Sequence, residues 1–263
     1  MATYTHGHHE SVLRSHTVRD IANSAAYLRP HLHDGIRLLD VGAGPGSITV
    51  DFASVVAHVT ATEIDEAALS LSRELAAERG LTNLDFSVED VHGLSFADDS
   101  FDVVHAHQVL QHVGDPVQAL REMRRVAVPG GVVAARDADY AGFLSFPVLP
   151  ELERWLDLYR RAARANGGEP DAGRRLLSWA RAAGFEDVEA TASTWCYATP
   201  EERAWWGGMW ADRIRESALA RQLVASGMAT PDDLDEISEA WKRWAADGDG
   251  WYLAPHGEII ARA

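Results

Sequence analysis

Residues 37–65 constrain the fold more than any other part of the chain. They read RLLDVGAGPGSITVDFASVVAHVTATEID: an apolar run, three glycines within five residues, a helical pattern and a second apolar run that ends in acids. A strand followed by closely spaced glycines and a helix is typical of a loop that holds a nucleotide-like ligand, because glycines let the backbone approach the ligand and the helix offers free N–H groups. A tight strand-to-helix turn without a ligand would also favour glycines, so the loop alone leaves both interpretations open.

The spacing of the glycines indicates which ligand the loop would hold. Gly42, Gly44 and Gly46 alternate with single residues, whereas a dinucleotide loop uses G-x-G-x-x-G. Asp40 precedes the first glycine by two residues, and a carboxylate there favours a ligand with positive charge over a pyrophosphate. We therefore expect S-adenosylmethionine (SAM). Glu63, at the end of the second apolar run, is expected to accept hydrogen bonds from two ribose hydroxyls.

Up to about Tyr140 the chain alternates short β-branched runs with helical patterns. This alternation predicts βαβ units and a parallel sheet. The expected strands cover residues 37–41, 58–63, 84–88, 101–105 and 131–136, and the expected helices cover 47–56, 66–79 and 116–126.

After Tyr140 the pattern changes to long helical segments in which tryptophans gather. Strand patterns return at GFEDVEATASTWCYAT and at WYLAPHGEIIARA, and they are expected to complete the sheet, with residues 205–246 inserted between them. We therefore predict added cap helices in this part of the chain.

Charge and composition exclude several kinds of partner. The formal charge is -16 and the pI about 5.1, which repels a phosphate backbone, so we expect no nucleic acid. A single cysteine, Cys196, excludes an intramolecular disulfide framework and a cysteine-rich zinc site. No apolar stretch approaches the roughly 20 residues of a membrane span, and the first residues lack the pattern of a secretory signal. We expect a cytoplasmic protein, monomer or homodimer, with a small-molecule partner and no membrane.

Residues 35–138 carry five ordered motifs: LDVGAGPG, TEID, EDVHGLSF, SFDVVHAHQVLQHVGDP and ALREMRRVAVPGG. In this order and spacing they resemble class I SAM-dependent methyltransferases of the small type that includes the ubiquinone and menaquinone biosynthesis enzymes. The resemblance implies an α/β, Rossmann-like fold with a seven-stranded, mostly parallel sheet and helices on both faces. One departure is Glu63, where the family's usual acid is Asp; either carboxylate can bridge the ribose.

The resemblance also implies which residues contact SAM. The first motif would surround the ligand, TEID would hold the ribose, and the acid of EDVHGLSF would contact the adenine amino group. After the fourth strand, His107 or Gln108 would touch the cofactor. The residues assigned to the cofactor in this way are Asp40, Gly42, Ala43, Gly44, Gly46, Glu63, Ile64, Asp90, Val91, His107 and Gln108.

The segment before the first strand, residues 1–34, is expected to form a helical lid over the cofactor. Arg14 could pair with the methionine carboxylate of SAM, and Tyr4 or His9 could close over the sulfonium. A solvated terminus is the alternative. The histidines of HGHH lack a spaced partner pair, so no metal site is predicted.

Methyl transfer from a sulfonium is an in-line displacement, so alignment is the main task of such an enzyme. An oxygen or carbon acceptor must also lose a proton, for which histidine is suited. His112, with His9 as a second candidate, is expected to serve as the catalytic residue; a structural role under the following turn is the alternative for His112. Asp137, Asp139 and Tyr140 end the fifth strand at the same edge and are expected in the pocket, unless they form a plain polar loop.

Aromatic residues of the predicted cap supply candidates for an acceptor-binding wall. They are Trp155, Tyr159, Trp205, Trp206 and Trp210. At helical spacing such residues more often form core, so both interpretations stay open.

Together these observations predict one compact unit made of a lid (1–34), a SAM-binding core (35–140) and a part that completes the sheet and carries the cap (141–263). We expect transfer of a methyl group from SAM to an oxygen or carbon atom of a small biosynthetic metabolite. The alternatives are N-methylation of an amine or peptide, a SAM-binding protein without turnover, and an NAD(P)-dependent oxidoreductase. The last is opposed by the glycine spacing and by the lack of a Tyr-x-x-x-Lys pair.

Overall fold

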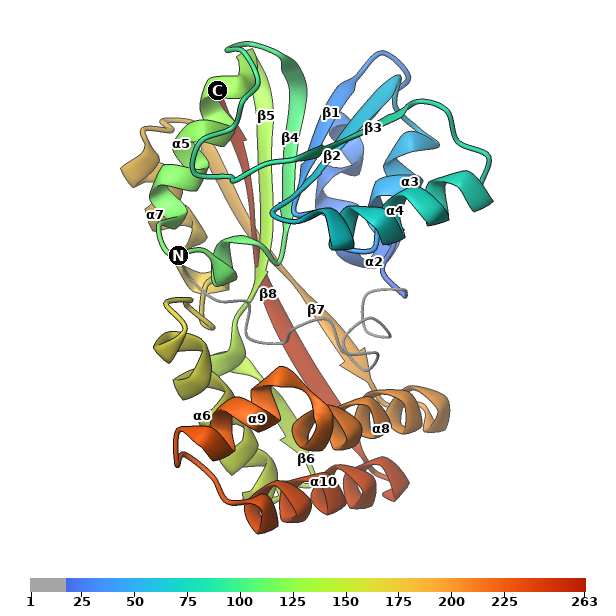
Figure 1. Cartoon of the computed structure of the whole chain (residues 1–263), viewed down its shortest axis with the longest axis vertical. Helices are drawn as coiled ribbons and strands as arrows, with labels where there is room; N and C mark the ends of the chain where they lie inside the picture. Colours follow the sequence, from blue (N-terminus) through green and yellow to red (C-terminus); the bar gives the residue numbers. More distant parts are fainter. Residues whose placement is uncertain (1–17) are drawn as a thin grey trace.

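The structure is a computed structural model that describes residues 18–263, and it divides into an α/β core and a helical cap (Figure 1). Tyr4, His9 and Arg14 lie outside the described residues, so their roles stay predictions. The described part of the expected lid consists of two short helices, α2 (Ile21–Ser24) and the 3₁₀ helix η1 (Ala26–His31), which pack against the core.

The described residues form one eight-stranded sheet with the order β3-β2-β1-β4-β5-β8-β6, in which β7 pairs with the free edge of β8. Strands β1 to β5 are parallel, and the pairs of β8 with β5, β6 and β7 are antiparallel. The strands are β1 Arg37–Val41, β2 His58–Glu63, β3 Leu84–Val88, β4 Phe101–His107, β5 Ala127–Ala138, β6 Leu144–Phe146, β7 Val188–Tyr197 and β8 Trp251–Arg262.

The prediction of a mostly parallel sheet is confirmed, and the strand that sequence reasoning missed is β6. It has three residues and precedes Pro147, so it shows no alternating pattern long enough to detect. The expected strands after residue 184 are confirmed as β7 and β8.

Helices cover both faces of the core sheet. One face packs on α5 and α7, and the other on α2, η1 and α3. The helices are α3 Ser47–Ala53, α4 Glu66–Glu78, η2 Leu110–His112, α5 Pro116–Val126, η3 Tyr140–Gly142, α6 Pro150–Ala165, η4 Gly173–Arg175, α7 Leu176–Ala183, α8 Pro200–Glu216, α9 Ala218–Ala225 and α10 Pro231–Ala246.

The two longest helices of the inserted segment begin at the same local sequence signal. In α8 the Thr199 hydroxyl accepts from the Glu202 backbone N–H while the Glu202 carboxylate accepts from the Thr199 N–H. Thr230 and Asp233 make the same reciprocal pair at α10. Each pair satisfies backbone donors that a helix start leaves open, and a proline follows each threonine at the first helical position.

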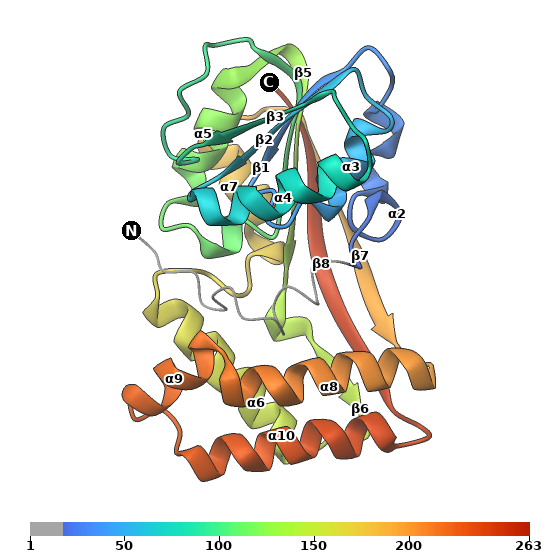
Figure 2. The ribbon, with the colours of Figure 1, turned by 45° about the vertical axis from the view of Figure 1, so that its right-hand side comes forward.

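The cap is joined to the core through the long strands β7 and β8, which run side by side from the core to the cap helices (Figure 2). β8 pairs with β5 over residues 256–262 and with β6 over residues 251–253. Helices α6, α8, α9 and α10 enclose a core of their own that is rich in tryptophan, with the Trp155 and Trp210 ring centroids 4.5 Å apart, edge to face.

No helix among residues 18–263 combines the length and apolar character that crossing a membrane requires.

A cavity between the sheet edge and the cap

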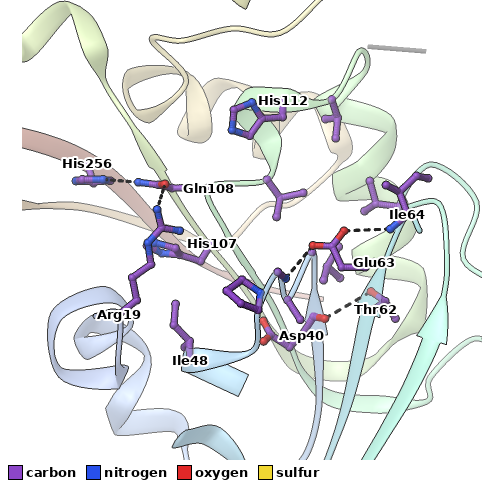
Figure 3. Close-up of a pocket in the computed structure, with 18 of the residues that line it drawn as sticks. Arg19, Asp40, Ile48, Thr62, Glu63, Ile64, His107, Gln108, His112 and His256 are labelled. Carbon is purple, nitrogen blue, oxygen red and sulfur yellow. Dashed lines mark hydrogen bonds between the residues drawn. The ribbon is translucent and has the colours of Figure 1, made fainter. Parts of the chain in front are cut away.

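The carboxyl ends of the parallel strands meet at one edge of the sheet. Val41 pairs with Thr62 and Ala106, Glu63 pairs with Val88, and so the loops after β1, β2, β3 and β4 lie together. A cavity of about 800 Å³ at this edge is lined by residues of these loops (Figure 3) and by residues of helix α8 of the cap.

Two groups of described residues line the cavity. The glycine-loop half contains Asp40, Gly42, Ala43, Gly44, Glu63, Ile64, Glu89, Asp90, Val91, His92 and Asp115. The aromatic half contains Arg19, His107, Gln108, His112, Tyr140, Phe143, Trp195, Trp206, Trp210, Arg213 and His256. Most of the site residues predicted from the sequence line one of these two halves of the cavity.

The three glycines of the loop all have positive φ, 67° at Gly42, 57° at Gly44 and 84° at Gly46, a region that other residues rarely adopt. Two of them are also required by packing. A Cβ on Gly42 would lie 2.5 Å from Cγ2 of Val109, and one on Gly46 would collide with Ser72 of α4. Close approach to the protein's own side chains therefore explains part of the glycine pattern.

Glu63 connects the end of β2 to the glycine loop. Its Oε1 accepts from the Gly44 backbone N–H at 2.8 Å, and its Oε2 accepts from the Ile64 N–H at 3.1 Å (Figure 3). Ile64 is exposed. The carboxylate is thus fixed by the backbone of two loops at the cavity wall.

Asp40 has a different set of partners from the one expected. It is 3% exposed; one carboxylate oxygen accepts from the Thr49 hydroxyl at 2.6 Å and the other lies 2.8 Å from Nδ1 of His105. These contacts tie α3 and β4 together beneath the loop. The carboxylate therefore supports the loop through these contacts and also lines the cavity, and its place beside a ligand's positive charge stays a prediction.

Asp90 is held in its ionised form by the next turn of the chain. Its Oδ1 accepts from the His92 backbone N–H at 2.9 Å, and this bond holds the pKa of the carboxyl below its usual value. Val91 beside it is buried and apolar. An ionised acceptor next to an apolar surface suits a flat heterocycle that carries an amino group.

A chain of hydrogen bonds crosses the boundary between the halves. Arg19 Nη2 donates to Gln108 Oε1 at 2.8 Å, and Gln108 Nε2 donates to His256 Nε2 at 2.8 Å (Figure 3). His256 Nδ1 in turn lies 3.0 Å from the carbonyl of Ala254. Both contacts of His256 can be hydrogen bonds only if its imidazole is neutral and carries the proton on Nδ1, so that Nε2 accepts and Nδ1 donates. Gln108 makes this link with φ at 55°, a strained conformation for a residue other than glycine.

His107 lies between the two halves at the end of β4. It is 7% exposed, its ring stacks between those of His105 and His256, and neither ring nitrogen has a hydrogen-bond partner among the described residues. Burial first, and then the charges of Arg19 and Arg136, hold the pKa of His107 well below its usual value. His107 is therefore a neutral side chain that lines the cavity while both of its ring nitrogens are buried.

His112, the expected proton acceptor, is engaged by its neighbour. Gln111 Oε1 accepts from the Ala138 N–H at 3.0 Å, which fixes the amide orientation, so Gln111 Nε2 donates to His112 Nε2 at 2.9 Å. Burial and the Arg19 charge lower the pKa of His112 to about 3. With its lone pair occupied and its basicity reduced, His112 is poorly suited to remove a proton.

The expected aromatic wall divides between cavity and core. Trp206 and Trp210 line the cavity, whereas Trp155 and Tyr159 are each 1% exposed and lie behind it in the cap core. Tyr140, expected in the pocket from the end of the fifth strand, also lines the cavity. Trp205 is partly buried against that core, outside the cavity lining.

Asp137 and Asp139 also lie outside the cavity lining. Asp137 is fully buried, its Oδ1 accepts from the Gln111 N–H at 2.9 Å, and burial raises its pKa to about 8. Asp139 binds the Arg174 guanidinium, with contacts of 2.6 and 2.7 Å. Both carboxyls therefore support the turns around the cavity.

In the aromatic half, five lining residues were missed from the sequence: Arg19, Phe143, Trp195, Arg213 and His256. In the glycine-loop half, Glu89, His92 and Asp115 were missed. Gln108 and His256 are 148 residues apart, and no local sequence pattern predicts a contact between them. Among residues 18–263 no group of three or more His, Cys, Asp or Glu side chains is arranged to hold a metal ion.

Comparison with known proteins gives consistent matches. A family model described as a methyltransferase domain matches residues 32–192. The chain is 34% identical over 270 residues to an uncharacterized methyltransferase of Schizosaccharomyces pombe, covering 98% of this chain and 95% of the relative. It is 31% identical over 172 residues to a ubiquinone/menaquinone biosynthesis C-methyltransferase of Idiomarina loihiensis, covering 59% of this chain and 68% of the relative.

A solved structure of phosphoethanolamine N-methyltransferase 2 from Haemonchus contortus, in complex with phosphomonomethylethanolamine and S-adenosylhomocysteine, has a TM-score of 0.56 and 20% identity. The match covers 90% of this chain and 52% of that one.

Proposed function

Because this chain belongs to the methyltransferase domain family and is a SAM-dependent methyltransferase, we propose that it methylates an oxygen or carbon atom of a small biosynthetic metabolite. The observation that carries the proposal is the cavity itself. One continuous space joins an edge fitted for SAM to an aromatic chamber under the cap. The relative that acts in ubiquinone and menaquinone biosynthesis supports a small metabolite as acceptor.

The residues of the glycine-loop half fit SAM. We infer that Glu63, already oriented by Gly44 and Ile64, accepts hydrogen bonds from the ribose hydroxyls. Asp90 and Val91 would receive the adenine, since an ionised oxygen and an apolar side chain lie together there. When bound, SAM supplies the electrophilic methyl group.

On the acceptor side, the chain's own residues align the substrate and exclude water. Tyr140, Trp206 and Trp210 are each at least nine-tenths buried, so an acceptor between them would be shielded from solvent. His107, unpartnered at the boundary of the two halves, would contact the acceptor close to the transferred methyl group. We infer that alignment in a dry chamber provides the main contribution to rate.

The charges of the aromatic half favour oxygen or carbon over nitrogen as the acceptor atom. Its described lining includes Arg19 and Arg213, and these guanidinium groups would disfavour binding of an amine in its protonated form. N-methylation is therefore the second candidate and rests on no comparable observation.

The test is transfer of radiolabelled methyl groups from SAM to matched panels of phenols, enolisable diketones and amines, with product masses determined. Label in phenols or at enolisable carbon is expected, with Glu63→Ala as the cofactor-deficient control. Label only in amines would support the second candidate. Binding of SAM without transfer to any panel would indicate a SAM-binding protein without turnover.

A further inference from the structure

The end of the sheet formed by β6, β7 and β8 has two unlike faces. Residues that pair across antiparallel strands point to the same side of a sheet, and successive residues alternate between the sides. On β8, Tyr252 and His256 point to the buried side, which packs on the cap core and lines the cavity. Trp251, Leu253 and Pro255 therefore point to the opposite side, which we call the outer face.

Helices cover the outer face only where the strands belong to the core. There Ile259 and Ala261 of β8 pack with residues of α5 and α7. The cover ends at the short helix η4, because a Cβ on its Gly173 would lie 2.6 Å from the backbone nitrogen of Gly257. Nearer the cap, the outer-face residues of β6 and β7 are exposed, and those of β8 are exposed or partly buried.

Large apolar side chains gather at the β6 side of this open part of the outer face. Leu144 pairs with Leu253, and Phe146 pairs with Trp251. The exposed fractions are 57% for Leu144, 57% for Phe146, 63% for Val148 and 36% for Trp251. With about 200 Å² for a fully exposed large apolar side chain, these four residues present roughly 400 Å² of apolar surface. A patch of this size on a folded chain indicates an interaction site.

Charge favours a second copy of this chain as the partner. The formal charge of -16 makes most of the surface of one copy repel another. On the open outer face, the described residues in the rows that contain Trp251, Leu253 and Pro255 are all uncharged. Two copies can therefore meet there without placing like charges in contact, whereas an anionic lipid surface would be repelled by the chain as a whole.

The outer face is also complementary in shape to itself. Its β6 side carries the large residues Leu144 and Phe146, and its β7 side carries the smaller residues Thr194 and Cys196. A twofold axis parallel to β8 would place β6 of each copy over β7 of the other, as in the aligned packing of two sheets. Because Leu144 and Cys196 both pair with Leu253, they lie in one row, and the axis brings Leu144 of each copy over Cys196 of the other.

The available area approaches what a stable dimer needs. Two copies would bury about 800 Å² from the four large side chains alone, and a specific interface buries about 1,200 Å² or more in total. The exposed residues Thr194 and Cys196 of both copies add to the first figure. A contact of this symmetric kind is closed at two subunits, so it yields a dimer and no longer chain of copies.

We propose that the protein forms a twofold-symmetric homodimer through the outer face of β6, β7 and β8, with Leu144 and Phe146 of each copy against the β7 side of the other. The interface lies directly behind the cavity, since Trp195 and His256 line the cavity from the other side of the same strands. Dimerisation thereby braces the strands that join the cap to the core. This inference goes beyond the proposed function and does not depend on it.

The first experiment is sedimentation equilibrium of the full chain. At about 10 μM we expect a mass twice that of the 28.8-kDa chain. Phe146→Asp should weaken the association at least about 100-fold, because it places a charge on each side of an apolar interface. The matched control is Val224→Asp, at an exposed position of α9, which should leave the association unchanged. Affinity for S-adenosylhomocysteine within about twofold of the wild type in both variants reports an intact fold.

A pair of complementary variants tests the direction of the twofold axis. Leu144→Asp and Cys196→Lys should each weaken self-association. Mixed together they should associate at least 10-fold more tightly than either alone, because one opposite-charge pair then forms across the interface. An axis that crosses the strands would place Leu144 over Leu144 instead, and the mixture would gain nothing.

Three results would overturn the proposal. The first is a chain that stays monomeric up to about 100 μM, and the second is a dimer whose association survives Phe146→Asp. A monomer that binds phosphatidylcholine vesicles, with loss of binding in Phe146→Asp, would assign the face to a lipid surface. In a monomer without vesicle binding, protection of Phe146 from hydroxyl-radical labelling would assign the face to residues 1–17 of the same chain.

The outcome is separable from the test of the proposed function. Transfer of methyl groups to oxygen or carbon acceptors by a monomer would keep the function and reject this inference. A dimer that transfers label only to amines would do the reverse.

Discussion

The backbone N–H of Gly44 donates to the carboxylate of Glu63 at 2.8 Å, so the turn after β1 and the end of β2 are joined through a side chain. The same carboxylate accepts from Ile64 through its second oxygen. The loop and the acid that would hold the ribose are therefore oriented by each other before any ligand arrives, which lowers the entropy lost on binding.

Glu63→Ala should weaken binding of SAM and of S-adenosylhomocysteine. One or two charge-assisted hydrogen bonds, each about 1.5–3 kcal/mol, would be lost, so a decrease of at least about tenfold is expected in calorimetry. Glu78→Ala, at the exposed end of α4, is the control. An affinity for SAM equal to that of Glu78→Ala would show that Glu63 does not bind the ribose.

Gly42→Ala should destabilise the protein more than Gly80→Ala. Both glycines have φ of 67°, so each alanine should cost about 1–2 kcal/mol of backbone strain. Only Gly42 faces a neighbour, Val109, whereas nothing lies within 4 Å of a Cβ on Gly80. Overpacking against Val109 should lower the free energy of unfolding of Gly42→Ala by about a further 1–3 kcal/mol. Denaturant unfolding measures both, and adding Val109→Ala to Gly42→Ala should recover part of the excess. Equal losses at the two glycines would show that the contact is absent.

Asp137→Asn should make the stability of the protein less sensitive to a rise in pH between about 4 and 8. Burial raises the pKa of the folded carboxyl to about 8, from 3.8, so between about pH 4 and 8 the folded state binds more protons than the unfolded state. The contribution of the Asp137 carboxyl to the free energy of unfolding therefore falls as pH rises, by up to about 1.4 kcal/mol per pH unit. Asparagine cannot ionise and still accepts from the Gln111 N–H. The variant's stability relative to wild type should increase from pH 5 to pH 8 in chemical denaturation; a difference that stays constant would show that Asp137 is ionised throughout.

His112→Asn should reduce kcat by less than about tenfold and leave the pH–rate profile unshifted. A general base would contribute about 10²–10⁴, but His112 already accepts from Gln111 and its pKa is lowered to about 3. The asparagine oxygen keeps an acceptor for Gln111. Single-turnover rates across pH 5–9, with an acceptor identified by the label screen, provide the measurement. Loss of an ionisation together with a hundredfold slower rate would restore His112 as the catalytic base.

The sequence predicts the core well because its signals are local. The glycine loop, the acid at the end of β2 and the positions of the strands along the chain each follow from residues that are neighbours in the sequence, and parallel strands bring their carboxyl ends to one edge. The role of Asp40 could not be predicted the same way, since Thr49 and His105 approach it from other elements.

The aromatic half was harder to predict because helical spacing does not say which side of a helix faces a cavity. On α8, buried residues cover a wide face of the helix, and Trp206 and Trp210 look the same in the sequence as Trp155 on α6, which lies in the core. Arg213 and Arg19 look like ordinary surface residues in the sequence, and only the packing of the cap against the sheet edge places them at the cavity.

The pairing of Tyr197 with Tyr252 places the two ends of the inserted helices on neighbouring strands. The chain leaves the sheet and returns to it at one point, so residues 198–250 form a cassette whose two ends already lie side by side. Exchanging such a cassette requires no new crossing of the sheet and leaves the loops after β1, β2 and β3 untouched. A replacement must match the side of α6 that carries Trp155, and also Phe146 and Tyr252, which Trp244 contacts. The architecture thus lets one methyl-donor site serve successive acceptor chambers during evolution or in engineering.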